Sequence, residues 1–128
     1  MLRLSILSGK FGICRFEPSA RLPVWAMDGS FFSITRTPEE LSIVCPEDSI
    51  PNGTHSEKGW RCLKVLGPLP FELTGVLSSL AEPLARAGVS IFAISTHDTD
   101  YLMVKEHDLS RAVETLRIAG HRVAAGYP

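Results

Sequence analysis

Apolar and polar residues alternate over short distances in the first half of the chain. Four strands are expected there, at residues 2–7, 11–16, 31–35 and 41–45. The stretch 17–30 carries Pro18, Pro23 and Gly29, which leave room for one helical turn at most. The segment 46–59 is polar and rich in turn residues, so the pattern predicts a loop.

The second half has longer and more regular patterns. One helix is predicted from apolar residues at i, i+3, i+4, i+7 and i+8 spacing, namely Leu73, Val76, Leu77, Leu80, Ala81, Leu84 and Ala85. Pro83 should kink or break its last turns, and Gly88 should end it. A second helix is predicted from Leu109, Ala112, Val113 and Leu116, with Asp108 as N-cap and Gly120 at its end. Strands are expected at residues 60–66, 89–95, 101–105 and 121–125.

The order of elements from residue 60 onward is β-α-β-β-α-β, which is the ferredoxin-like pattern of an α+β protein. Two helices should cover one face of a four-stranded antiparallel sheet. The first half has the same order with vestigial helices, so it is interpreted as a degenerate copy. We expect one unit at 1–59 and a complete unit at 60–128, with the 60–66 strand a candidate to serve both.

The predicted core of the second unit lies between its helices and its sheet. Its members are Leu77, Leu80, Leu84, Ile91, Ala93, Leu102, Val104 and Leu116.

Composition excludes several classes of protein. The 128 residues carry a formal net charge of −1, so there is no basic excess to neutralise nucleic acid phosphates. The apolar runs are too short to cross a bilayer, and the N-terminus is unlike a signal peptide. The 3 cysteines have long spacings and form no CxxC pair, which argues against disulfides and zinc. We therefore expect a cytoplasmic protein without a cofactor.

Two polar segments are candidates for binding. In residues 95–100, Asp98 and Asp100 are two apart, so an extended chain would direct both carboxylates to one side, toward a cation; a solvated turn is the alternative. Residues 67–75 lead from a strand into a helix, whose first N–H groups attract anions; the alternative is a plain connection capped by Glu72 or Thr74.

No motif in the sequence indicates catalysis. The histidines have no metal-ligand spacing, and no GxSxG, HExxH or Cys/His arrangement occurs. We therefore assign no catalytic residue and no metal, and a small enzyme using Asp98 and Asp100 is the weakest hypothesis.

The β-α-β-β-α-β order resembles the ACT domain family, which consists of small regulatory modules that bind amino acids. Residues 91–104, IFAISTHDTDYLMV, resemble the IS-T-x-x-T-D-x-x-LV signature of the paired ACT domains in cytosolic arginine sensors and their uncharacterised bacterial relatives. Residues 71–77, FELTGVL, resemble the loop-to-helix segment of that group. The match is good over 60–125 and weak over 1–59.

The resemblance implies a ligand between the loop after the first strand and the second strand of a neighbouring unit. Helix N–H groups would hold its carboxylate, and Glu72, Asp98 or Asp100 its cationic group. The implied ligand-binding residues are Phe71, Glu72, Thr74, Gly75, Ser95, Thr96, Asp98, Thr99 and Asp100.

Two functions from different classes follow. The first is a non-enzymatic regulatory or sensor module that binds a free amino acid, with arginine or lysine ranked first. We expect this module to be a homodimer, or a pseudo-dimer built within one chain. The second is a protein–protein interaction module of the same fold with no small ligand, whose edge strands pair with another chain.

Overall fold

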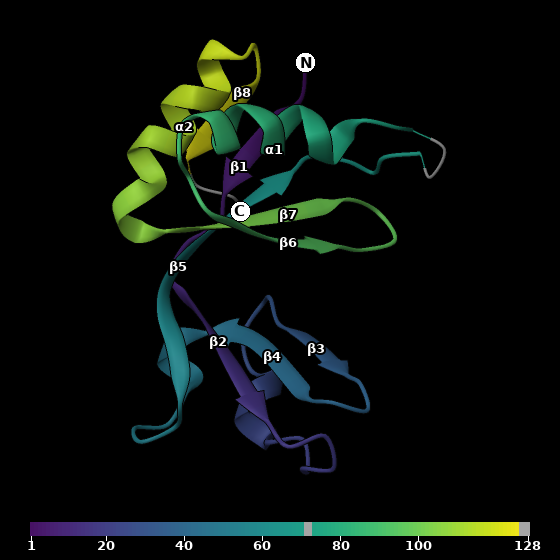
Figure 1. Ribbon diagram of the computed structural model, residues 1–128, viewed down its shortest axis with the longest axis vertical. Helices are drawn as coiled ribbons and strands as arrows, with labels where there is room; N and C mark the ends of the chain where they lie inside the picture. The colour runs from purple at the N-terminus through teal and green to yellow at the C-terminus, as the bar shows by residue number, and fades with distance from the viewer. Residues whose placement is uncertain (71–72, 126–128) are drawn as a thin grey trace. The chain divides into compact units, whose positions relative to one another are not determined.

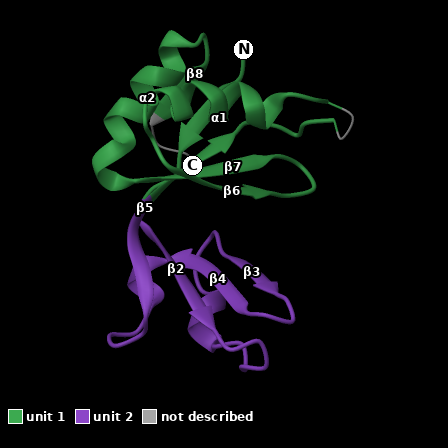
Figure 2. Cartoon of the chain, in the orientation of Figure 1, with its two compact units in different colours: residues 1–8, 61–128 green, residues 9–60 purple. Residues whose placement is uncertain are grey.

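The computed structural model describes residues 1–70 and 73–125. The chain forms two compact units: unit 1 contains residues 1–8 and 61–128, and unit 2 contains residues 9–60 (Figure 2). The sequence analysis grouped residues 1–8 with the first half of the chain, but in the structure they pair with strands of unit 1.

Unit 1 is an α+β sandwich in which two helices cover one face of a sheet (Figure 1). The helices are α1 (Val76–Arg86) and α2 (Leu109–Ile118), and a short 3-10 turn, Glu106–Asp108, precedes α2. The strands are β1 (Arg3–Ile6), the second half of β5 (Ser56–Val65), β6 (Ile91–Ser95), β7 (Asp100–Lys105) and β8 (Arg122–Ala125). Their order in the sheet is β6-β7-β5-β1-β8.

The sheet of unit 1 has one strand more than the sequence analysis expected. β1 lies between β5 and β8, antiparallel to β5 and parallel to β8. Leu4 pairs with Val65 on one side and with Val123 on the other, and all three belong to the same core. Without β1, the order of the remaining strands is the ferredoxin-like order of a β-α-β-β-α-β unit.

Unit 2 has the ferredoxin-like order with short 3-10 turns in place of helices. Its strands are β2 (Phe11–Phe16), β3 (Ser33–Arg36), β4 (Leu41–Pro46) and the first half of β5, in the order β3-β4-β2-β5. The turns are Val24–Met27 and Glu47–Ser49. The first of these is the single helical turn that the prolines in residues 17–30 allow. The fold is therefore one complete ferredoxin-like unit and one degenerate unit, and β5 contributes a half to each.

Several element boundaries differ from those expected. β5 begins at Ser56, although the sequence suggested a loop to residue 59, because polar residues here belong to a strand that pairs with β2. The first helix starts at Val76 after Gly75 in the left-handed region, rather than at Leu73. It continues past Pro83 to Arg86, so of the kink or break expected at Pro83 the break is wrong. Gly88 ends it with a φ of +75°, as expected.

The core of unit 1 lies between the helices and the sheet. Five predicted core residues are buried there: Leu80, Leu84, Leu102, Val104 and Leu116. Leu77 and Ile91 are partly buried against the same core. Ala93 is exposed, so this prediction is wrong; it lies on β6, a strand at the edge of the sheet.

Of the helices in the described residues, none has the length and apolar character that a membrane span requires.

His121 joins three elements of unit 1. Pro83 has no N–H, so the carbonyl of Ser79, four residues earlier, lacks its helical donor. The Nε2 of His121 lies 3.2 Å from that carbonyl, and its Nδ1 accepts a 3.1 Å hydrogen bond from the backbone N–H of Leu2. Because Nδ1 accepts, Nε2 carries the proton and donates to Ser79. The ring therefore connects β1 to the interrupted hydrogen bonding of α1.

Leu80→Ala should destabilise the protein by about 2–5 kcal/mol, because it leaves a cavity in a fully buried site. Ile118→Ala is the control: this residue is 78% exposed, and its truncation should cost about 0.5 kcal/mol or less. Denaturant unfolding measures both. A loss of stability below about 1 kcal/mol for Leu80→Ala would mean that the side of α1 that faces the core has been misassigned.

His121→Leu should cost about 1–3 kcal/mol, since it removes the partners of Leu2 and Ser79. Pro83→Ala supplies a backbone N–H to the Ser79 carbonyl, so the cost of His121→Leu should be smaller in that background. A double-mutant cycle by denaturant unfolding measures the difference. Strictly additive losses of stability would contradict the hydrogen bond from His121 to the Ser79 carbonyl.

Candidate functional site

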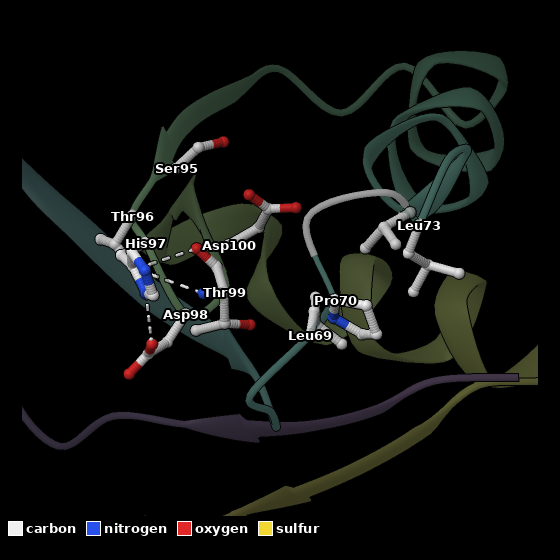
Figure 3. A pocket seen from close by; sticks show the side chains of 10 residues that line it. Leu69, Pro70, Leu73, Ser95, Thr96, His97, Asp98, Thr99 and Asp100 are labelled. Atoms are coloured by element: carbon white, nitrogen blue, oxygen red, sulfur yellow. Dashed lines mark hydrogen bonds and ion pairs between the residues drawn. The ribbon is translucent and has the colours of Figure 1, made fainter.

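A cavity of about 240 Å³ lies in unit 1 where the 95–100 segment meets the loop that follows β5. One wall is Leu69, Pro70, Leu73 and Val76, from this loop and the first turn of α1. The other wall is the whole run from Ser95 to Asp100, at the ends of β6 and β7 (Figure 3). Two segments that are far apart in the sequence thus form the two walls of one cavity.

Hydrogen bonds close the connection between β6 and β7 into a tight turn. The backbone N–H of Thr96 donates to the carbonyl of Thr99 at 2.8 Å, and the Oγ1 of Thr96 lies 3.1 Å from the same carbonyl. The N–H of Thr99 lies 3.3 Å from the Oγ1 of Thr96. Threonine hydroxyls commonly stabilise turns in this way. The solvated-turn interpretation therefore describes the backbone correctly, although the turn also lines a cavity.

The two carboxylates do not point to the same side, and that expectation is wrong. Asp98 belongs to the turn, so the alternation of an extended chain does not reach it. Its side chain is 71% exposed, and Oδ1 lies 2.9 Å from the Nδ1 of His97. Asp100 is the first residue of β7 and pairs with Ser95. Figure 3 shows its carboxylate directed between the two walls, while that of Asp98 is turned toward His97.

The strand register explains the direction of Asp100. Residues that pair across two antiparallel strands lie on the same face of the sheet. The pairs of β6 and β7 on the face of Asp100 are Ala93 with Leu102 and Ile91 with Val104. Leu102 and Val104 belong to the core beneath the helices. The half-buried Asp100 therefore lies on the face covered by α1, near the start of that helix.

The start of α1 borders the cavity. The N–H of Ser79 donates to Gly75 at 2.9 Å, and the N–H groups earlier in the first turn have no acceptor within the helix. The side chain of Val76, the first residue of α1, lines the cavity. The cavity thus has a carboxylate on one side and the positive end of a helix on the other.

The structure places five of the nine predicted residues on the cavity wall: Ser95, Thr96, Asp98, Thr99 and Asp100. Thr99 is 5% exposed, and its hydroxyl donates to the carbonyl of Val65 at 2.6 Å. Gly75 is the N-cap of α1 and Thr74 is exposed, but neither lines the cavity. Phe71 and Glu72 lie outside the described residues.

The cavity also has lining residues that the sequence analysis did not select. Four of them are apolar and belong to the loop or the start of α1, and the fifth is His97. Leu69 and Pro70 lie within residues 67–75, the candidate segment of the sequence analysis, but neither was named there as a ligand-binding residue. His97 lies inside the selected 95–100 run, and its lack of ligand-like spacing is what excluded it.

The three cysteines are not among the residues that line the cavity. Burial raises the pKa of Cys45 to about 11 and that of Cys62 to about 12, and it also raises the pKa of Cys14. Buried, protonated thiols of this kind are not reactive. Within residues 1–70 and 73–125, no three His, Cys, Asp or Glu side chains are grouped to hold a metal ion.

Two family models match parts of the chain. A model for the ACT domain matches residues 55–117, and a second model, for an N-terminal domain, matches residues 9–53. The cytosolic arginine sensor for mTORC1, subunit 1, of Bos taurus is 33% identical over 97 residues. The match covers 67% of this chain and 30% of the sensor, so this chain spans less than a third of that relative's length.

Two solved structures share this fold over most of the chain. A protein of Agrobacterium tumefaciens is 42% identical with a TM-score of 0.93, over 99% of this chain and 95% of that one. The regulatory subunit of aspartate kinase from Thermus thermophilus has a TM-score of 0.60 at 8% identity, over 87% of this chain and 91% of that one. The likeness to the kinase subunit concerns the fold alone.

Proposed function

Because this chain belongs to the ACT domain family, we propose that it is a non-enzymatic regulatory or sensor module that binds a free amino acid in the cavity beside Asp100. The observation that carries the proposal is the placement of a carboxylate opposite the start of α1. A free amino acid is a zwitterion, so it needs an acceptor for its ammonium group and donors for its carboxylate within one small cavity.

The size of the cavity suits such a ligand. Pockets for drug-sized molecules have volumes of about 300–1,000 Å³, and this cavity, at about 240 Å³, is somewhat smaller. Leu69, Pro70 and Leu73 supply an apolar wall for the aliphatic part of a side chain. A cavity of this volume excludes large substrates such as nucleotides or peptides from full burial.

The carboxylate of the ligand would accept hydrogen bonds from the first N–H groups of α1. Its ammonium group or basic side chain would pair with Asp100, which is directed into the cavity. Asp98 is the less suitable partner, since its carboxylate already pairs with His97 and is largely exposed. Arginine and lysine rank first because each carries a second cationic group for the acidic side of the site.

The similarity to an arginine sensor supports this choice of ligand. The Bos taurus protein is named as a cytosolic arginine sensor, and its aligned region, which is 33% identical, covers 67% of this chain. Because that relative is named as cytosolic, we propose that this chain is also cytoplasmic.

The second function is an interaction module with no small ligand. It would use β6, a strand at the edge of the unit 1 sheet, to pair with another chain.

A thermal-shift screen with each of the twenty amino acids separates the two functions. A ligand present at 100 times its dissociation constant stabilises the native state by about 2.7 kcal/mol, which raises the unfolding temperature measurably. We expect the largest shift with arginine or lysine. No shift with any amino acid would favour the interaction module.

Calorimetric titration with the best ligand then tests the named residue. Asp100→Asn should lower the affinity about 10- to 100-fold, because a charge-assisted hydrogen bond becomes a neutral one. Asp98→Asn is the matched control, with the same chemical change two residues away and an expected effect within about threefold. Equal affinities for the wild type and Asp100→Asn would remove Asp100 from the site.

The protein should form a homodimer. Ser95, which lines the cavity, ends β6 at the edge of the sheet, so a second copy placed along this edge would stand beside the ligand. Light scattering should show a dimer, with the bound amino acid favouring it. A strict monomer with and without the ligand would leave the cavity within a single chain as the whole site.

A further inference from the structure

Two hydrogen bonds join the segments that form the two walls of the cavity. The hydroxyl of Thr99 donates to the carbonyl of Val65 at 2.6 Å, across 34 residues of sequence. The backbone N–H of Leu69 donates to the carbonyl of Asp98 at 2.7 Å. These two hydrogen bonds, with Gly67 between them, are called the loop junction here. They connect the end of β5 and the following loop to the turn before β7.

Gly67 lies at the closest approach within the junction. A Cβ at this position would lie 3.0 Å from the backbone nitrogen of Leu69 and 3.1 Å from the carbonyl oxygen of Asp98. It would also lie 3.4 Å from the Cβ of Thr99. Two of these neighbours are backbone atoms, which cannot rotate away as a flexible side chain can. A larger residue at 67 therefore requires the loop or the turn to shift by a few tenths of an ångström.

Thr99 is at the same time the residue next to Asp100 in sequence. Its side chain is buried and its hydroxyl is already engaged, so it has little left to offer a ligand. Its carbonyl accepts the N–H of Thr96 and so closes the turn. Because the backbone of Thr99 is held on both sides, the direction in which Asp100 leaves the turn is fixed as well.

We propose that Thr99 and Gly67 are positioning residues which set the spacing between the two walls and the orientation of Asp100, without touching the ligand. Thr99 acts through its hydrogen bond, which attaches the turn to the end of β5. Gly67 acts because it has no side chain, so the backbone of the turn can approach the loop closely. This assigns Thr99 a different role from direct ligand contact. The part that concerns affinity rests on the proposed amino-acid binding, whereas the junction itself does not.

Three variants test the junction in the ligand-free protein by amide hydrogen exchange. Thr99→Val keeps the shape and removes the donor, so exchange at the Leu69 amide should rise about tenfold. Thr99→Ser restores the hydroxyl and should bring exchange within about threefold of the wild type. Gly67→Ala should also raise it about tenfold, because the loop must move away from Asp98. An unchanged Leu69 amide in Thr99→Val and Gly67→Ala would overturn the junction.

Affinity for arginine, or for the amino acid that the screen identifies, gives the second readout. It should fall about tenfold in Thr99→Val and recover in Thr99→Ser. Thr35→Val, at an exposed position of β3 in unit 2, makes the same chemical change and should leave the affinity unchanged. Leu116→Ala destabilises unit 1 from α2 and should leave the affinity of the folded protein unchanged as well.

The outcomes separate the two proposals. If the wild type binds no amino acid, the proposed function fails, and the exchange at Leu69 still decides whether the junction exists. If the wild type binds and Thr99→Val binds equally well, the positioning role is wrong while the function stands. If Thr99→Val loses affinity and Thr99→Ser does not recover it, the hydroxyl is not the group that matters, and the role is again wrong.

Discussion

Unit 1 depends on the antiparallel pairing of β1 with the second half of β5. β8 pairs with β1 rather than with β5, so β1 is the only strand through which β8 joins the described part of the sheet. Leu4 fills the core between Val65 and Val123 and is almost fully buried. Loss of β1 would therefore remove both backbone partners and a core side chain from the middle of the sheet, in a fold whose total stability is only about 5–15 kcal/mol.

Much of unit 1 could be predicted because its signals are local. The spacing of Leu80, Leu84 and Leu116 identifies the buried sides of two helices within single turns, and Gly88 marks a helix end by its backbone alone. The place of β1 could not be predicted in this way. Its alternation indicates a strand with one buried face, but the choice of partner strand is made by residues some sixty positions away.

The candidate site divides along the same line. The run 95–100 was recognisable from its polar composition and its resemblance to a family signature, and the structure places that whole run on one cavity wall. The different environments of Asp98, Thr99 and Asp100 were not recognisable. They depend on where the turn stops and β7 begins, and on the carbonyl of Val65, which is remote in sequence. Sequence composition can therefore indicate where such a site lies, whereas the strand register determines which way each of its side chains points.

The position of unit 2 in the chain has a topological consequence for unit 1. β1 and the second half of β5 are adjacent antiparallel strands, and the N–H of Leu7 still donates to the carbonyl of Cys62 at 2.9 Å where they end. Residues 9–60 thus occupy the place in which most antiparallel neighbours have a reverse turn of two to five residues. The entropic cost of closing a connection grows only with the logarithm of its length, so a sheet can accept a whole folded unit at such a point. By the same reasoning, excising residues 9–60 and joining Ser8 to Arg61 through a two-residue Asn-Gly turn would leave every strand pairing of β1 in place.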